Sequence, residues 1–203
     1  MSSVLELTVA SPVEAWKAVG LRVEGDTCWV GGIRMRFVPV DSEPAVTGWT
    51  LAGVPSSDRP ASIDGLATAY EDDDIEPESW SHELGATSFD HVVVMTSSIE
   101  RTCGAIEAAT MAPLKRIREA GAIRQGFHRL GPMIVEVVES AQVTAPTASF
   151  WGFVLIVEDL HEVCARLGPE LISIPKAAVQ PGRFIASFRG TAGLGLPIAL
   201  MTP

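Results

Sequence analysis

The chain has 203 residues and a mass of 21.6 kDa, enough for one large domain or two small ones with a sizeable core. Its composition, 47% hydrophobic and 20% charged, is typical of a globular protein, and no apolar run approaches the roughly 18–20 residues of a membrane-spanning helix. The net charge of −10 argues against nucleic acid or an anionic membrane as a partner.

Two features predict a cytoplasmic protein. The N-terminus lacks the basic stretch and apolar block of a secretory signal. The three cysteines, Cys28, Cys103 and Cys164, are odd in number and show no CxxC spacing. Reduced, buried thiols are therefore expected.

The acidic charge is concentrated in the N-terminal part of the chain. Residues 1–86 contain 15 acidic and 5 basic side chains, whereas residues 87–203 contain 10 of each. Six acids crowd into the stretch Glu71–Glu78, which indicates a solvated, Pro-rich insert or linker over residues 55–88. The acidic balance as a whole suits a cationic ligand.

Three short apolar strands each lead into a predicted helix start. Each start offers a side-chain oxygen to the free N–H groups of a helix, and a Glu follows three residues later. The strands and their helix starts are Val4–Ala10 with Ser11, His91–Thr96 with Ser97, and Phe153–Val157 with Asp159. Three strand-like runs separated by turn residues follow each helix, so the chain contains three β-α-β-β-β units, at 4–54, 89–139 and 150–201.

These units resemble the vicinal oxygen chelate superfamily, which includes glyoxalase I, bleomycin-resistance proteins and extradiol dioxygenases. The stretches that carry the resemblance are Phe89–Val94 with Ile99–Thr102, Trp151–Val157 with Glu158–Leu160, and the closing Pro197–Met201. The resemblance implies an α+β fold in which repeated βαβββ modules form mixed curved sheets around a cleft. It implies a degenerate module at 1–54, the insert at 55–88, and a glyoxalase-like domain at 89–203 made of modules 89–139 and 150–201.

Metal-dependent members of this superfamily draw ligands from the first and fourth strands of each module. The resemblance places His91 and Glu136 at these positions in the module 89–139, a possible half of a divalent-metal site. In the module 150–201 the same positions fall at Gly152, or Phe153 if the register slips by one, and near Ala199. Residues 171–203 contain no Asp, Glu, His or Cys, so the resemblance points to a member with a degenerate metal site.

Three interpretations of His91 and Glu136 remain open. They form a metal-free hydrogen bond that lines the cleft, they bind a metal completed by waters, His128 or another chain, or they act directly as acid and base. Two further groups are candidates for the cleft. Arg116 and Arg118 alternate on a strand and share a face that meets a carboxylate or phosphate, and Trp151 can stack on a ligand.

The first functional hypothesis is a glyoxalase-like small-molecule-binding protein without a cofactor. The alternative is a divalent-metal-dependent lyase, isomerase or dioxygenase, and a purely regulatory or assembly role is a third class, so enzymatic activity is left open. A homodimer is also expected, because three modules leave the one at 4–54 without a partner in its own chain. The competing solution is internal: Ile63–Tyr70 and its neighbours supply a shrunken fourth module.

Overall fold

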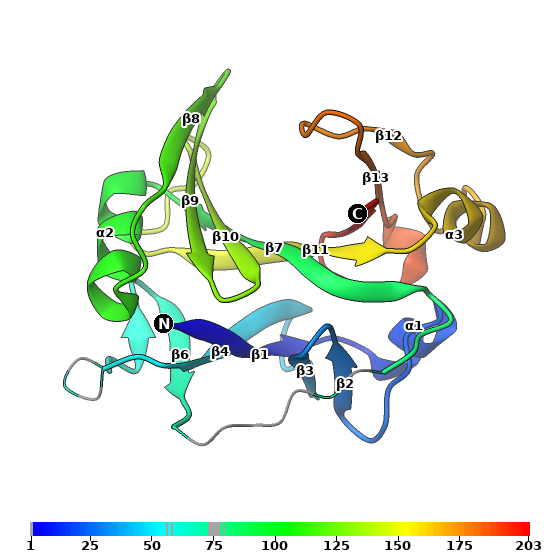
Figure 1. Ribbon diagram of the computed structural model, residues 1–203, viewed down its shortest axis with the longest axis horizontal. Helices are drawn as coiled ribbons and strands as arrows, with labels where there is room; N and C mark the ends of the chain where they lie inside the picture. The colour runs from blue at the N-terminus through cyan, green and yellow to red at the C-terminus, as the bar shows by residue number, and fades with distance from the viewer. Residues whose placement is uncertain (1, 56, 58, 73–77, 79) are drawn as a thin grey trace.

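The computed structural model describes residues 2–55, 57, 59–72, 78 and 80–203, and it arranges them in two layers of β-sheet (Figure 1). The first sheet has the strand order β2-β3-β1-β4-β6-β5. Its strands are β1 (Ser3–Ala10), β2 (Thr27–Val30), β3 (Ile33–Val38), β4 (Ala45–Ala52), β5 (Ser62–Ile63) and β6 (Leu66–Tyr70).

The second sheet has the order β12-β13-β14-β11-β7-β10-β9-β8. Its strands are β7 (Ala86–Thr96), β8 (Arg116–Ala120), β9 (Ile123–Leu130), β10 (Met133–Ser140), β11 (Ser149–Val157), β12 (Lys176–Ala177), β13 (Phe184–Ser187) and β14 (Ile198–Met201). The helices are α1 (Val13–Ala18), α2 (Ile99–Thr110), α3 (Leu160–Leu167) and the short 3-10 helix η1 (Gly190–Ala192).

The second sheet consists of two βαβββ modules, as the sequence predicted. In each module the last strand returns beside the first in parallel, β10 beside β7 and β14 beside β11. The two modules join through the antiparallel pair β7–β11. The predicted α+β class with mixed sheets is therefore confirmed.

The first sheet is divided differently from the prediction. The strand that lies parallel to β1 is β3, whereas β4 runs antiparallel to β1 and parallel to β6. The segment expected to close a module at 4–54 therefore opens a second, shortened module made of β4, β5 and β6. The first sheet thus pairs its modules within one chain, which removes the reason for expecting a homodimer; no contact in the structure tests the dimer itself. Of the acidic stretch Glu71–Glu78, residues 73–77 lie outside the described part of the chain.

Of the three predicted helix caps, Asp159 forms as expected, whereas α2 is capped by Ser98, one residue after the predicted Ser97. The side chain of Ser98 accepts a hydrogen bond from the N–H of Arg101 at the start of α2, and that of Asp159 accepts one from Glu162 at the start of α3. Ser11 does not cap α1. Its Oγ donates to the carbonyl of Leu194 over 2.6 Å and accepts from Nε1 of Trp16 over 2.8 Å, so it links the first layer to the end of the second.

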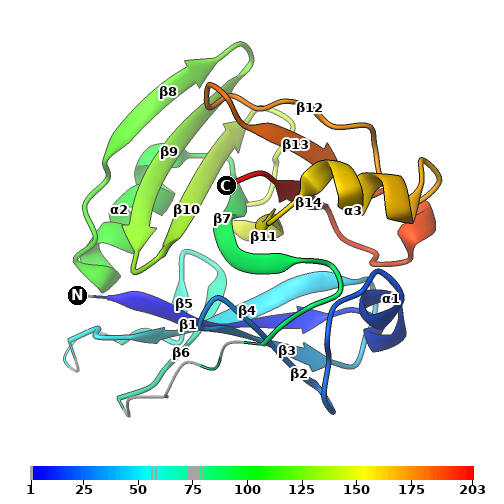
Figure 2. The same ribbon diagram turned by 45° about the vertical axis from the view of Figure 1, so that its right-hand side comes forward.

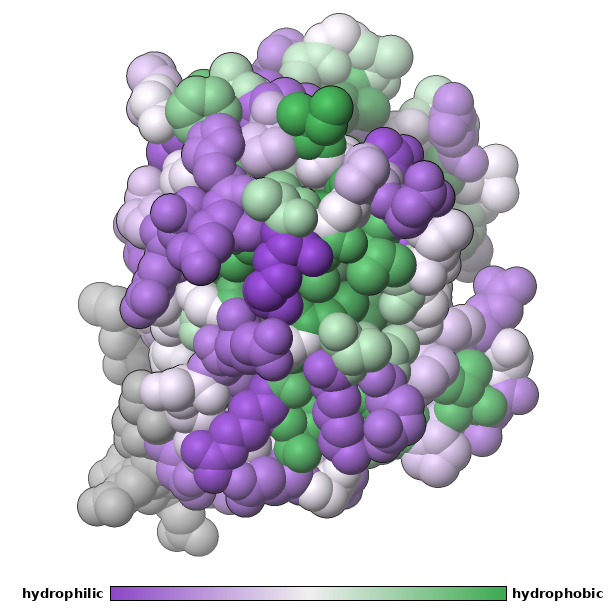
Figure 3. All heavy atoms as spheres, turned by 90° about the vertical axis from the view of Figure 1, so that its right-hand side faces the viewer, coloured by the Kyte–Doolittle hydropathy of each residue, from purple (hydrophilic) through white to green (hydrophobic). Residues whose placement is uncertain are grey.

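The main core lies between the two sheets. Trp16 and Phe153, both almost fully buried, stack with 5.9 Å between ring centroids. Aromatic side chains remove a large apolar area from water, so this contact holds the layers together. On the face that carries α1 and α3, apolar side chains gather in the middle and polar ones surround them (Figure 3). In the described part of the chain, no helix has the length and apolar character needed to cross a membrane.

Candidate functional site

The candidate site lies in a cleft of the second sheet. The sheet curls so that its two edge strands, β8 and β12, rise on opposite sides of a floor made by β7 and β11 (Figure 2). The cleft has two adjoining compartments, with volumes of about 630 Å³ and 620 Å³, and both are lined by His91, Gln125, Glu136 and Ile185. Each volume is typical of cavities that enclose a small organic ligand.

A β-bulge in β7 turns two consecutive side chains toward the face of the sheet that carries this cleft. His91 pairs with Val154 of β11 and Phe89 pairs with Leu155, so Asp90 has no partner on the neighbouring strand. Phe89 is buried in the core between the sheets, and strict alternation would put His91 on that same side. The extra residue resets the alternation, and His91 lies in the cleft beside Asp90.

Asp90 holds the imidazole ring of His91 in place. Its Oδ2 lies 2.6 Å from Nδ1 of His91, and its Oδ1 accepts a hydrogen bond of 2.8 Å from Nη1 of Arg183. Burial raises the pKa of Asp90, but the hydrogen bonds from His91 and Arg183 outweigh burial, and the pKa of this carboxyl lies below its ordinary value. Asp90 is therefore ionised at neutral pH and accepts a hydrogen bond from Nδ1–H of His91, which directs Nε2 toward the cleft.

Glu136 approaches His91 from the adjacent strand β10. Its Oε2 lies 3.3 Å from Nε2 of His91, so these two side chains converge as the strand order of the superfamily implies. Its Oε1 accepts a hydrogen bond from the side-chain amide of Gln125. The carbonyl Oε1 of Gln125 is buried and, among the described residues, has no hydrogen-bond partner. This oxygen is an acceptor available to a ligand where the two compartments meet.

The half of the cleft formed by β11 and β14 has no metal-ligating side chains at the positions equivalent to His91 and Glu136. Counting back from the N-caps of α2 and α3 puts Gly152 at the position of His91, and the register of β11 with β14 puts Ala199 at the position of Glu136. No group of three His, Cys, Asp or Glu in the described part of the chain is placed to hold a metal ion. A catalytic metal site normally has three protein ligands, so the residues of this cleft do not fit a complete one.

Residue 152 has no metal-ligating side chain for a steric reason. A Cβ atom built on Gly152 would overlap the main-chain carbonyl of Pro197. Because that obstacle is backbone, it cannot turn aside as a side chain would. The close approach of the chain before β14 therefore excludes every side chain, including a metal ligand, from this position.

The second compartment is mostly apolar, and two of its aromatic residues play different parts. Trp151 is 53% exposed and presents its indole to the compartment. Phe153 also lines it but is only 1% exposed, because its ring packs against Trp16 and Phe89 in the core. Trp151 is thus available for a ligand, whereas Phe153 belongs mainly to the layer contact.

The first compartment is bordered by basic side chains. Arg116 and Arg118 on β8 line it, as the sequence predicted for a shared face, and Lys176 on β12 joins them from the opposite edge. The lining therefore favours an anionic ligand, not the cationic ligand that the overall charge suggested. Sequence reasoning missed Lys176 and Gln125, which lie in segments without a recognisable motif. It also missed Asp90, although this residue precedes His91.

Several other candidates lie outside the cleft. His128 lines neither compartment: its ring is buried, Nδ1 donates to the carbonyl of Ala112 over 3.0 Å, and burial lowers its pKa. It is a structural histidine and not a third ligand. Cys28 and Cys103 are free and buried, and burial raises the pKa of each thiol to about 12, which excludes both as nucleophiles at neutral pH.

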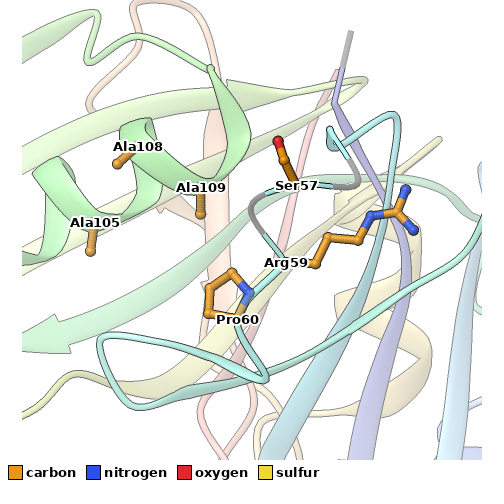
Figure 4. Close-up of a pocket in the computed structure, with 6 residues that line it drawn as sticks. All are labelled: Ser57, Arg59, Pro60, Ala105, Ala108 and Ala109. Atoms are coloured by element: carbon orange, nitrogen blue, oxygen red, sulfur yellow. The ribbon is translucent and has the colours of Figure 1, made fainter.

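A further hollow of about 520 Å³ lies between the segment after β4 and α2 (Figure 4). Its α2 side is lined by Ala105, Ala108 and Ala109, and the guanidinium of Arg59 turns away from them in Figure 4. That guanidinium pairs with Asp72 and the carbonyl of Val54. Of the described residues that line the hollow, Arg59 is therefore engaged elsewhere, and the α2 side offers a ligand only apolar contacts.

Solved structures share this architecture. A mutant of 4-hydroxymandelate synthase from Streptomyces coelicolor is similar with a TM-score of 0.64 and 12% identity, covering 98% of this chain and 92% of that chain. Methylmalonyl-CoA epimerase from Mycobacterium tuberculosis is similar with a TM-score of 0.50 and 14% identity, covering 59% of this chain and 89% of that chain. Both have vicinal oxygen chelate folds, so the chain has the glyoxalase-like fold that its motifs implied. The sequence itself matches no protein-family model and no curated protein.

Proposed function

We propose that the protein binds a small organic molecule in the cleft of the second sheet, without a metal held by a full set of protein ligands. The observation that carries this proposal is a two-compartment cleft in which His91 and Glu136 are the metal-ligating side chains among the described lining residues, too few for a complete metal site. Apolar side chains line most of the second compartment: Val93, Met95, Ile123, Val138, Phe188 and Ile198. An apolar enclosure with a few fixed polar groups is typical of small-ligand sites.

The polar groups at the junction of the compartments orient the ligand. His91 is held by Asp90, and Glu136 is held by Gln125, so neither side chain is free to turn. Preorganised groups of this kind bind a ligand without a large loss of side-chain entropy. His91, Glu136 and the free carbonyl of Gln125 then act as the hydrogen-bonding end of an otherwise apolar site.

A divalent-metal-dependent lyase, isomerase or dioxygenase is the second candidate. It is favoured by the contact between Asp90 and Nδ1 of His91, because metal-binding histidines commonly donate their other N–H group to a carboxylate. The two similar structures are also enzymes by name, a synthase and an epimerase. In this candidate, water or substrate would have to supply the ligands that Gly152 and Ala199 do not.

Metal analysis of protein purified without chelator or added metal separates the two candidates. We expect far less than one equivalent of zinc, iron, manganese or nickel per chain, and no change on His91→Ala. Stoichiometric metal that is lost in both His91→Ala and Glu136→Gln, and kept in the surface control His161→Ala, would favour the enzyme and contradict the proposal.

Ligand binding is tested with a neutral aromatic probe, naphthaleneacetamide, by calorimetric titration. We expect saturable binding of one probe per chain. Ser187 lines the second compartment, so Ser187→Trp should fill it and weaken binding about tenfold or more. Thr47→Trp, on an exposed position of β4, is the matched control. Equal affinity in both variants, or no saturable binding to the wild type of either this probe or a negatively charged analogue, would contradict a ligand site in this cleft.

A further inference from the structure

Three basic side chains that bond to neither a carboxylate nor a main-chain carbonyl among the described residues gather at one place in this molecule. Among the described residues, the other arginines and Lys17 each bond to a carboxylate or to a main-chain carbonyl. Arg116, Arg118, Lys176 and Lys115 have no such bond in the described part of the chain. The first three line the same compartment of the cleft. Lys115, which precedes β8, lines neither compartment.

The curl of the second sheet brings these groups together. Arg116 and Arg118 lie on β8 and Lys176 lies on β12, the two strands at opposite ends of the strand order. In Figure 1 these two strands face each other across the open side of the cleft. Residues two apart on a strand share a face and lie roughly 7 Å from each other, so the two arginines form one wall and Lys176 the facing wall.

Interactions within the protein leave these three charges available. Arg116 has its guanidinium 4.9 Å from the ring centroid of Phe127, which fixes its position without neutralising its charge. Arg118 is half-buried. Of the nearby carboxylates, Asp90 is paired with Arg183. Glu136, which lines the same compartment, accepts a hydrogen bond from the neutral amide of Gln125 and keeps its charge. Three cations against this one carboxylate leave an excess of positive charge, in a chain of net charge −10, and indicate a site that attracts an anion.

We propose that the ligand of the cleft is an amphipathic anion: a carboxylate or phosphate group bound by Arg116, Arg118 and Lys176, attached to an apolar or aromatic body in the Trp151 compartment. This inference rests on the proposed function, because it uses the same cleft. A hydroxyl or N–H group between the two parts donates to the free carbonyl of Gln125. The ligand therefore spans both compartments, which share His91, Gln125 and Glu136 at their junction.

Probes with one aromatic body and different head groups test this inference. Naphthaleneacetate carries a carboxylate, naphthyl phosphate carries a phosphate, and naphthaleneacetamide is neutral. We expect at least one anion to bind the wild type about tenfold more tightly than the amide, with an affinity that falls as salt rises. The stronger of the two anions identifies which head group the site prefers.

Substitutions at the basic residues test which of them cause the preference for an anionic probe. The variant Arg116→Gln/Arg118→Gln and the variant Lys176→Gln should each lose most of the preference for the anion while binding the amide as the wild type does. The control Lys115→Gln removes a neighbouring positive charge and should keep the preference. Measuring amide binding in every variant also shows that each one is folded.

The outcomes separate this inference from the proposed function. If the amide and both anions bind the wild type equally, or if Lys115→Gln weakens the anion as much as the cleft variants do, the anionic ligand is excluded and the cleft remains a binding site. If none of the three probes binds saturably, both proposals are contradicted.

Discussion

Asp90 and His91 are consecutive residues of β7, and their side chains nevertheless lie on the same face of the sheet, with 2.6 Å between Oδ2 and Nδ1. The bulge that leaves Asp90 unpaired with β11 makes this contact possible. Arg183, in the connection between β12 and β13, donates a hydrogen bond to the other carboxylate oxygen of Asp90. The orientation of His91 in the cleft therefore depends on Arg183, which lies 93 residues from Asp90 in the chain.

Asp90→Asn should destabilise the protein by about 2–3 kcal/mol, because it removes the charged partner of the half-buried guanidinium of Arg183, whose other bonds go to the carbonyl of Thr202. Urea denaturation measures this loss, and a double-mutant cycle with Arg183→Gln isolates the pair. Since the folded pKa of Asp90 is lowered, its stabilisation is present above the ordinary pKa of an Asp and is lost as pH falls through the folded value. Glu14→Gln, at a side chain that is 83% exposed, is the control. An equal loss of stability in both variants would show that the bonds of Asp90 to His91 and Arg183 do not stabilise the fold.

Gly152→Ala should cost about 3 kcal/mol or more or prevent folding, because its Cβ would overlap the main-chain carbonyl of Pro197. Gly104, in the interior of α2, has no atom within 4 Å of a built Cβ. Gly104→Ala should therefore stabilise the protein by about 0.5–1 kcal/mol. Thermal unfolding of the two variants measures the predicted loss of stability in Gly152→Ala and the predicted gain in Gly104→Ala. A stable Gly152→Ala protein would remove the steric reason for the missing donor.

Ser11→Ala should cost about 2–3 kcal/mol, because it leaves the indole N–H of Trp16 and the carbonyl of Leu194 unpaired in the core. Ser98→Ala removes a true N-cap, and about 1 kcal/mol is expected. Denaturant titration of both variants compares them directly. A smaller loss at Ser11 than at Ser98 would indicate that the hydrogen bonds of Ser11 between the layers contribute little to stability.

The stability should fall as pH drops from 7 toward 5, partly because of His82. Its Nδ1 accepts from the N–H of Arg22 over 3.1 Å, and its Nε2 donates to the carbonyl of Trp29 over 2.8 Å, a pattern that only the neutral ring satisfies. Burial, and to a lesser degree the charge of Arg22, lowers the pKa of His82. The unfolded chain therefore takes up this proton first as pH falls through the ordinary pKa of histidine, and stability is lost until the folded pKa is reached.

His82→Gln keeps one donor and one acceptor but does not titrate, so its stability should vary less between pH 7 and pH 5 than that of the wild type. Urea midpoints at the two pH values measure the slope. His161→Gln, on the exposed face of α3, is the control. An unchanged slope in His82→Gln would assign the pH dependence to other groups, among them the buried His128.

Local patterns predicted the modules of the second sheet well, because their signals are short-range. Strand alternation, the helix cap Asp159 and the glycines at the turns are each encoded within a few residues. The start of α2 is predicted to within one residue, because Ser98 and not Ser97 is its N-cap. The convergence of His91 and Glu136 followed from the strand order that the resemblance implied. In the first sheet the same kind of pattern misassigned β4, because a strand shows in its sequence that it is apolar but not which neighbour it pairs with.

The sequence by itself determined the fold class, the candidate pair His91 and Glu136, and the lack of any Asp, Glu, His or Cys after Glu170. Only the tertiary structure decided that Asp90 lies on the same face of β7 as His91, that Pro197 excludes a side chain at Gly152, and that Lys176 faces the arginines of β8. The physical reason is the same in each case. A bulge, a close approach of backbones and the curl of a sheet all arise from contacts between strands far apart in the chain, and no local spacing of residues records them.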